Sequence, residues 1–207
     1  MRISTTPASD ISGMRAALAH AEAVPLGQAW KQNPDGTAGS VRIVWCPEAL
    51  LVRADLHDED VFTRATGDSV NLCTLGDVFE VFLEAEGAGF YTEMHVAPEN
   101  FRLHLKFRQE DYDALVAKAL ALEALMVRPP GFQSRFEKLP GGWAAEVLIP
   151  AAAVDPTGSI SPDSRWRASF CRYDAFTDGR PPVLTSTSPH QEPVNFHVRN
   201  SWRPLCF

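Results

Sequence analysis

Residues 76–100 read GDVFEVFLEAEGAGFYTEMHVAPEN, and this stretch decides the fold. Two runs within it, 78–83 and 90–96, alternate large apolar residues with other types at every second position, which is the period of a β-strand. The segment EAEGAG between them contains the glycines that a tight reversal requires. The stretch therefore predicts an antiparallel hairpin with one apolar face.

The second face of this hairpin carries residues that are unusual for a solvated sheet. Alternation places Glu80 on that face of the first strand, and Tyr91, Glu93 and His95 on one face of the second strand. Carboxylates and an imidazole offer the acceptors and donors that sugar hydroxyls need, and an aromatic ring can pack against the C–H face of a sugar. These four residues are therefore candidates for ligand binding. The alternative is a solvated outer face on which the glutamates pair with a neighbouring lysine or arginine.

The rest of the chain repeats the same short, alternating pattern. Gly, Pro, Asn and Asp separate the runs, and strands at such regular spacing favour an all-β fold, a two-sheet antiparallel sandwich of the jelly-roll or immunoglobulin-like kind. The predicted strands are 40–46, 49–56, 78–83, 90–96, 101–107, 135–139, 143–149, 166–174 and 194–198.

Two segments have helical character instead. Ser9-Asp10 followed by ISGMRAALAHAEA predicts a short capped N-terminal helix, and residues 111–127 place apolar side chains at helical spacing before Pro129. We expect residues 1–23 to form an N-terminal helical extension, and residues 24–207 to form a single sandwich domain with one inserted helix.

The proline-rich segment 179–193 is predicted to be a long loop, and loops of this length are often functional.

Charge and cysteine content exclude several classes of function. The formal net charge is −7, and lysine and arginine are scattered rather than clustered, so we expect no nucleic-acid partner. The four cysteines form no CxxC pair, so they are expected to be free thiols rather than ligands of a zinc knuckle. No apolar run is long enough to span a membrane and no signal segment is evident, so the sequence as it stands indicates a cytoplasmic protein. A removed signal would instead make it periplasmic or secreted.

The order of the motifs carries a resemblance. ALLVRADLHDEDV is followed by GDVFEVFL, GGWAAEVLIPAAAV, WRASFCRYDAF and FHVRNSWRPLCF. In this order the segments resemble the family 9 carbohydrate-binding modules and the related DOMON-like β-sandwiches, over roughly residues 24–207. The resemblance implies a sandwich whose concave sheet and end loops bind sugars and whose loops are often braced by calcium.

The resemblance also implies roles for individual residues. Glu80 takes the place of an acidic residue that hydrogen-bonds sugar hydroxyls, a donor is expected near Glu93 or His95, and further polar contacts are expected near Arg172 and Asp174. Alternation places Arg172 and Tyr173 on opposite faces, so only one of them can face the ligand. The complete predicted ligand set is Glu80, Tyr91, Glu93, His95, Arg172, Tyr173, Asp174 and His190.

One feature of the family is missing from the sequence. Sugar-binding members hold the ligand between two loop tryptophans, whereas this chain has NLCTL at residues 71–75 and offers only Phe176 and His190 at the second place. The five tryptophans lie in or beside predicted strands, where we expect them to be core residues: Trp30, Trp45, Trp143, Trp166 and Trp202.

Two cofactors follow from the pattern or the resemblance. Asp55, Asp58 and Asp60 at the end of a predicted strand supply hard oxygen ligands for a structural calcium ion, although an acidic turn is the alternative. Some DOMON-like relatives bind haem in the sandwich interior. The residues that would do so here are Met94 or Met126 with His95, His104 or Lys106.

The sequence thus predicts a non-catalytic domain that binds a sugar or a similar polyhydroxylated ligand, with no nucleic-acid or membrane partner. The alternatives are a haem-binding electron-transfer domain, a structural or interaction domain without a small ligand, and a carbohydrate-active hydrolase that uses Glu80 and Glu93 as its carboxylate pair. The identity of the sugar and the oligomeric state are left open.

Overall fold

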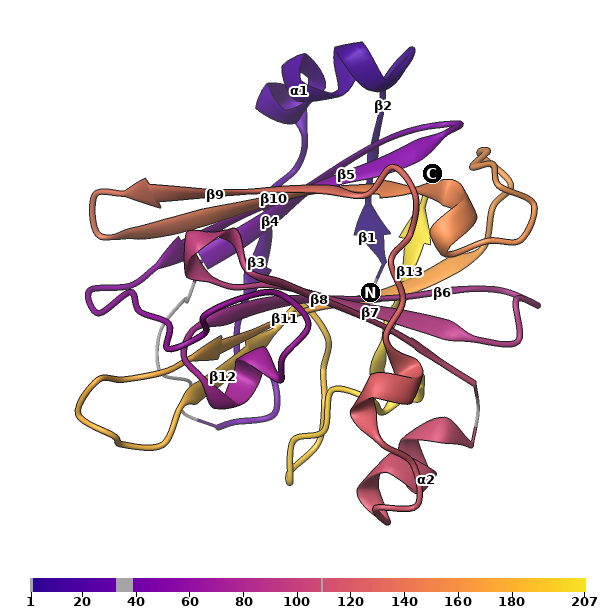
Figure 1. The fold of residues 1–207 in the computed structure, drawn as a ribbon. Helices are drawn as coiled ribbons and strands as arrows, with labels where there is room; N and C mark the ends of the chain where they lie inside the picture. The colour runs from indigo at the N-terminus through magenta and orange to yellow at the C-terminus, as the bar shows by residue number, and fades with distance from the viewer. Residues whose placement is uncertain (1, 33–38, 109) are drawn as a thin grey trace.

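A computed structural model describes residues 2–32, 39–108 and 110–207. Two β-sheets lie face to face, with α1 (Met14–Ala17) outside one sheet and α2 (Asp111–Val116) outside the other (Figure 1). This arrangement confirms the predicted two-sheet sandwich. The stacking also gives the seven-stranded sheet, on which the candidate residues lie, an outer face that other segments cover.

The seven-stranded sheet has the order β1-β13-β11-β6-β7-β8, with β12 also paired to β11. Its strands are β1 (Ile3–Ser4), β13 (Arg203–Cys206), β11 (Trp166–Asp174), β6 (Val78–Ala85), β7 (Tyr91–Val96), β8 (Arg102–Phe107) and β12 (Val183–Ser186). The six-stranded sheet has the order β2-β4-β5-β10-β9, with β3 also paired to β4. Its strands are β2 (Thr6–Pro7), β4 (Gly39–Cys46), β5 (Ala49–His57), β10 (Gly142–Pro150), β9 (Gln133–Leu139) and β3 (Val24–Leu26).

The hairpin predicted from residues 76–100 is present as β6 and β7. Glu80 pairs with His95, and Phe82 pairs with Glu93. Gly87 and Gly89 have φ values of 78° and 74°, a conformation that glycine adopts without strain. The register therefore places Glu80, Glu93 and His95 on one face, as alternation predicted.

The opposite face of the hairpin packs into the core between the sheets. Phe79, Val81 and Met94 from the hairpin meet Trp143 and Ile149 from the facing sheet, and all five are almost fully buried. Burial of each such side chain contributes about 1.5–3 kcal/mol, so this core supplies much of the stability of the fold.

A second apolar cluster covers the outer face of the seven-stranded sheet. The covering segments are residues 65–75, 112–126 and 194–202, and we call them the cover. They place apolar side chains over Val78 and Phe82 of β6. Both faces of the central hairpin are therefore buried.

The N-terminal segment is built into both sheets. β1 runs parallel to β13 and β2 runs parallel to β4, so these two pairs depart from the predicted antiparallel pattern. Asp10 caps the following turn by accepting a hydrogen bond of 2.9 Å from the N–H of Gly13. Met14 and Leu18 then pack on the outside of the six-stranded sheet. The boundary at residues 23 and 24 stays a prediction.

The helix predicted over 111–127 is wrong in its extent. α2 ends at Val116, and Leu122–Leu125 forms a separate 3-10 turn. Lys118 has a φ of 57°, and the N–H groups of residues 119 and 120 both donate to the carbonyl oxygen of Ala114, which ends the helix. The two short pieces let apolar side chains reach the sheet at different points.

Two further predictions near the C-terminus are corrected. The predicted loop 179–193 contains strand β12, and the predicted strand 194–198 is a turn whose Phe196 packs on the outer face. In the sequence, Val194, Phe196 and Val198 alternate with polar residues, which predicted a strand. In the structure Phe196 is buried and Val198 is 46% exposed, so these residues do not form one buried face.

The remaining 3-10 turns are Ile11–Gly13, Leu18–His20, Leu72–Thr74, Pro98–Asn100, Ala151–Ala153 and Arg199–Ser201.

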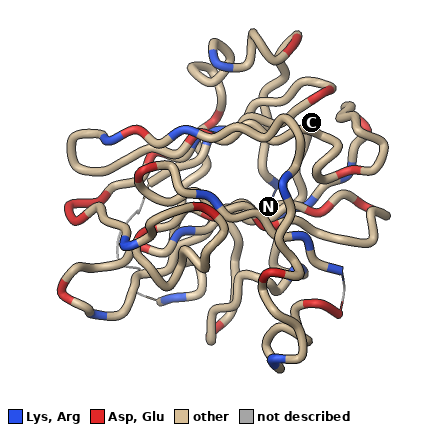
Figure 2. The backbone as a smooth tube through the Cα atoms, in the orientation of Figure 1, with Lys and Arg blue, Asp and Glu red and all other residues tan. Residues whose placement is uncertain are grey.

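Acidic and basic residues are interspersed along the backbone rather than gathered on one side (Figure 2). All four cysteines are free, and Cys46 and Cys171 are buried. Among the described residues, no helix is both long and apolar enough to cross a bilayer.

Candidate functional site

Glu80, Glu93 and His95 form a compact cluster on the outer face of β6 and β7. The Nε2 atom of His95 lies 2.5 Å from a carboxylate oxygen of Glu93 and 3.4 Å from one of Glu80. The three residues are 2–4% exposed. The hairpin register explains this convergence, because Glu80 and His95 are opposed and Glu93 lies two residues from His95 on the same face.

Burial and mutual contact set the protonation of this cluster. Burial raises the pKa of Glu80 to about 8, so that carboxyl group is mostly protonated at pH 7. Burial alone would also raise the pKa of Glu93, but His197 and His95 together lower it. Burial opposes a charge on His95, yet Glu80 and Glu93 raise its pKa. These shifts favour a neutral Glu80 beside an ion pair between Glu93 and His95.

Rings surround the cluster. The Tyr91 hydroxyl lies 2.9 Å from Nδ1 of His197, and the Tyr91 ring stacks on Phe107 with centroids 4.8 Å apart. The His197 ring stacks on Tyr112 at 4.0 Å, and its Nε2 lies 3.7 Å from Glu93. Burial lowers the pKa of His197, which favours its neutral form. Polar groups thus lie within an aromatic enclosure.

Residues 194–202 of the cover are held in part by polar contacts. Arg199 donates to Glu84 at 2.8 Å, and both side chains are about one quarter exposed, at 26% and 24%. The guanidinium of Arg199 also lies over the Tyr91 ring, 5.6 Å from its centroid. This ion pair ties the turn at Arg199 to β6 at the edge of the outer face.

The expectation that these residues line an open concave face is wrong in one respect. Glu80, Tyr91, Glu93 and His95 converge, but none is more than 4% exposed, because the cover packs apolar side chains over the sheet. Sequence periodicity identified the shared face correctly. It carried no information about a covering layer built from segments distant in the chain.

Arg172 and Asp174 lie on the other face of the same sheet. Arg172 is fully buried and donates to the carbonyl oxygen of His57 at 2.6 Å, to Asp58 at 2.8 Å and to Asp174 at 2.9 Å. Arg172 pairs across strands with Phe79, which belongs to the core between the sheets. These residues therefore do not join Glu80, and alternation had correctly separated Arg172 from Tyr173.

A set of three carboxylates surrounds this arginine. Oxygen atoms of Asp58, Asp77 and Asp174 lie within 4.8 Å of one another. Asp77 accepts hydrogen bonds from the N–H groups of Phe62 and Ala175, so it joins two loops. Burial raises the pKa of Asp77 to about 7.

The predicted calcium ligands do not fit this arrangement. Asp55 points away and pairs with Arg42 at 2.9 Å and Arg53 at 3.0 Å. Asp60 accepts from the N–H and hydroxyl of Thr177, both at 2.8 Å. Only Asp58 of the predicted set lies at the carboxylate group, and its oxygen is bound by the Arg172 guanidinium. The guanidinium of Arg172 therefore supplies the positive charge that a calcium ion would bring to these carboxylates.

Tyr173, His190 and Trp30 lie along the same outer face as Glu80. Tyr173 and Trp30 are half-buried against the second apolar cluster, and Trp30 contacts the His190 ring with centroids 5.9 Å apart. His190 is buried, which lowers its pKa to about 4, and its Nε2 lies 3.3 Å from the Ser169 hydroxyl. The other four tryptophans are buried as expected.

Trp30, Tyr112 and His197 are the residues that sequence analysis missed at this site. Trp30 precedes the first long strand, Tyr112 was assigned to an amphipathic helix and His197 to a strand. Trp30 lies outside every predicted strand, and this position could have marked it as a loop residue that contacts a ligand.

Met94 does not fit a haem site with His95 or His104, and the combinations with Met126 stay a prediction. Met94 faces the core between the sheets, whereas His95, its neighbour, faces outward. Met94 and His104 are opposed on adjacent strands, so they extend side by side and cannot approach an iron from opposite sides of a macrocycle. Lys106 lies over the Phe90 ring at 3.5 Å.

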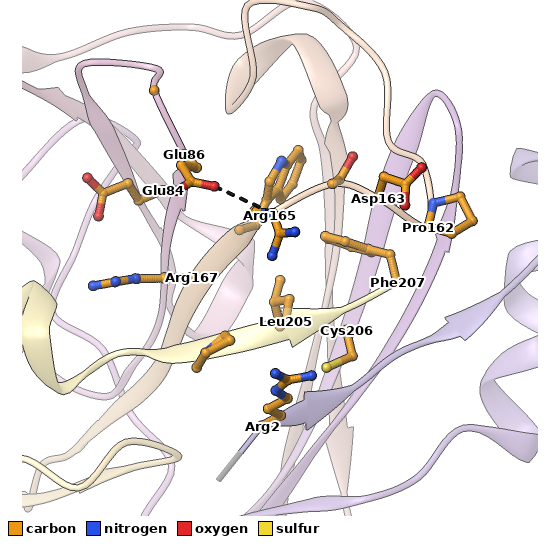
Figure 3. A pocket seen from close by; sticks show the side chains of 14 residues that line it. Arg2, Glu84, Glu86, Pro162, Asp163, Arg165, Arg167, Leu205, Cys206 and Phe207 are labelled. Atoms are coloured by element: carbon orange, nitrogen blue, oxygen red, sulfur yellow. Dashed lines mark ion pairs between the residues drawn. The ribbon is translucent and has the colours of Figure 1, made fainter.

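A separate groove opens at the far end of β6 (Figure 3). It has a volume of about 680 Å³ and is lined by residues that include Arg2, Glu86, Arg165, Arg167 and Phe207. Figure 3 shows Glu86 and Arg165 directed toward one another. The Nε atom of Arg165 lies 3.8 Å from Oε2 of Glu86. Charges of both signs line this groove, and it contains none of the predicted ligand residues.

Comparison with known proteins bears on the fold. No protein-family model matches the sequence, and a search of curated proteins finds no match. Among solved structures, a Bacteroides uniformis protein with a provisional carbohydrate-binding designation is similar, with a TM-score of 0.78 and 16% identity, covering 100% of this chain and 98% of that one.

Two structures of a family 9 carbohydrate-binding module from Caldicellulosiruptor kristjanssonii are also similar. The complex with cellotriose has a TM-score of 0.68 and 13% identity, covering 100% of this chain and 93% of that chain. The complex with glucose has a TM-score of 0.68 and 12% identity, covering 100% and 95%. The chain thus has the fold of family 9 carbohydrate-binding modules, as the order of its motifs indicated.

Proposed function

We propose that this protein binds a carbohydrate, without catalysis, on the outer face of its seven-stranded sheet. The observation that carries the proposal is the convergence of Glu80, Glu93 and His95 within a ring-lined enclosure. Structures with the same fold contain cellotriose and glucose, which supports a saccharide as the ligand.

The chemistry of the face suits a polyhydroxylated ligand. A protonated Glu80 both donates and accepts hydrogen bonds, and the charged Glu93–His95 pair supplies stronger contacts. Trp30, Tyr112 and Tyr173 are half-buried, so their rings can pack against the C–H face of a sugar without leaving the protein.

Binding at this face requires the cover to move, because the polar cluster is buried. Residues 194–202 are the segment that we expect to move. Polar contacts from Arg199 to Glu84, and from His197 to Tyr91 and Glu93, fix part of this segment. Saccharide binding then replaces some of these contacts with hydrogen bonds to hydroxyl groups, so the affinity is expected to be modest.

Titration calorimetry with glucose and cello-oligosaccharides, together with a glycan array, tests the proposal. We expect Glu80→Ala to remove binding. Glu80→Gln preserves the donor and acceptor of the protonated acid, so it is expected to keep binding within a few-fold. Glu137→Gln, on the other sheet, is the matched control, and melting curves check that each variant folds.

An absence of binding to every saccharide would contradict the proposal and would favour the alternative of a structural or interaction domain. An equal loss of saccharide affinity in Glu80→Ala and Glu137→Gln would show that the loss does not come from this face.

A further inference from the structure

The Glu80–Glu93–His95 cluster has the composition of a metal site as well as that of a polar binding face. One ligand atom from each of the three residues lies within 4.8 Å of the others, and all three residues are buried. The Oε2 atom of Glu93 and the Nδ1 atom of His95 have no hydrogen-bond partner within the described part of the chain. The unpartnered Glu93 oxygen faces Nε2 of His197 at 3.7 Å.

The protein supplies little positive charge to these carboxylates. Among the described residues, no arginine or lysine forms an ion pair with Glu80 or Glu93, whose neighbours are the imidazoles of His95 and His197. The nearest arginine of the cover, Arg199, is engaged with Glu84. Two carboxyl groups in an apolar enclosure need protons or a cation, because isolated buried charge is costly.

The other cluster of carboxylates in the described chain, formed by three aspartates, is arranged differently. At Asp58, Asp77 and Asp174 the guanidinium of Arg172 already lies among the oxygens. The cluster at Glu80 lacks such a residue in the described chain and offers imidazole nitrogen in addition to oxygen. It is therefore the cluster suited to an external cation.

We propose that Glu80, Glu93 and His95 bind a divalent transition-metal ion of the zinc class, with His197 as a neighbouring fourth donor. Carboxylate oxygen combined with imidazole nitrogen is a donor set typical of Zn²⁺, Mn²⁺ and Fe²⁺, whereas calcium prefers oxygen alone. Two carboxylates and neutral imidazoles balance the charge of a divalent ion. Paired strands hold the three main donors, so their positions are well fixed.

Zinc chloride alone is the probe for calorimetry, and Co²⁺ is the spectroscopic substitute. We expect one ion per chain, and a visible Co²⁺ absorption band that Zn²⁺ abolishes. His95→Gln and Glu93→Gln are expected to weaken binding at least 100-fold. The matched controls His20→Gln and Glu137→Gln remove an exposed imidazole and a carboxylate outside the cluster, and they are expected to bind as the wild type does.

Three results would overturn the proposal: no stoichiometric binding by folded wild-type protein, equal binding by the cluster variants, or a Co²⁺ spectrum that His95→Gln leaves unchanged. Circular dichroism and melting curves establish folding, and His197→Gln gives a second, milder variant for which a weakening of about tenfold is expected.

The metal test is independent of carbohydrate binding, because it contains no sugar. A saccharide titration in the presence of a chelator tests the proposed function separately. Metal binding without sugar binding, or the reverse, therefore distinguishes failure of one proposal from failure of the other.

Discussion

Glu80 and His95 occupy directly opposed positions on β6 and β7, and their side chains meet at 3.4 Å. The register of a single hairpin therefore fixes the centre of the candidate site. Because successive strand residues point to opposite faces, a shift of one residue would bring apolar Val81 or Phe79 to this position and separate the polar groups.

Loosening the cover is expected to strengthen apparent saccharide binding. Glu84→Gln removes the ion pair with Arg199, a partly exposed contact worth about 0.2–1 kcal/mol. If binding needs the open cover, a larger open population raises the apparent affinity by up to about fivefold. Calorimetry measures the affinity, and hydrogen exchange of residues 194–202 measures the opening.

The control for this variant is Glu86→Gln, whose exposed partner Arg165 lies outside the cover. Faster exchange in Glu84→Gln combined with weaker binding would mean that the closed cover forms part of the site.

Removing the Trp30 ring is expected to weaken saccharide binding while the fold persists. The ring is half-buried at the edge of the second apolar cluster, so its contribution to folding is smaller than that of a core tryptophan. Loss of one aromatic contact costs about 1 kcal/mol, or about fivefold in affinity. Trp30→Ala is compared with Phe62→Ala, which removes a ring that packs on Arg64 instead. Unchanged affinity in Trp30→Ala would remove Trp30 from the site.

Acid is expected to destabilise the protein through His190. Burial lowers the pKa of this imidazole from 6.5 to about 4, so the unfolded chain binds its proton more readily between these values. Stability contributed by the neutral imidazole is therefore present above pH 6.5 and is lost as the pH falls toward 4. The loss is at most about 3 kcal/mol.

Urea unfolding at pH 7 and pH 5 measures this effect. His190→Phe keeps a ring against Trp30 and Phe196 but cannot bind a proton, so it should lose less stability on acidification than the wild type. His20→Gln removes an exposed imidazole and serves as the comparison. If His190→Phe and the wild type lose the same stability between pH 7 and pH 5, His190 is not the cause of the acid effect.

Loss of Arg172 is expected to be strongly destabilising. Arg172→Met leaves Asp58 buried without its partner, and breaking a buried ion pair in this way typically costs about 3–5 kcal/mol. Adding Asp58→Asn removes the unpaired charge and should recover part of the loss. Denaturant unfolding of the two single variants and the double variant gives the coupling energy, and strict additivity would show that the pair does not interact.

The predictable parts of this molecule are those governed by local periodicity. Alternation in residues 76–100 was sufficient to place Glu80, Glu93 and His95 on one face, and alternation in residues 166–174 separated Arg172 from Tyr173. Strand existence followed from the same signal because each strand buries at least one face.

The parts that sequence analysis missed depend on tertiary contacts. The half-buried Trp30 and His197 reach the site from segments without regular structure, and the cover hides a face that we expected to be open to a ligand. Segment 194–198 alternates like a strand, but Phe196 is buried by packing on a sheet rather than by pairing within one. A periodic pattern reports which residues share a face and leaves open whether another segment buries that face.

The guanidinium of Arg172 affects how far the fold depends on ions in the solution. Unlike a bound metal ion, it is covalently part of the chain. A chelator or dilution therefore cannot remove it. The loops that Asp58, Asp77 and Asp174 brace are therefore held in a manner independent of the ionic composition of the medium.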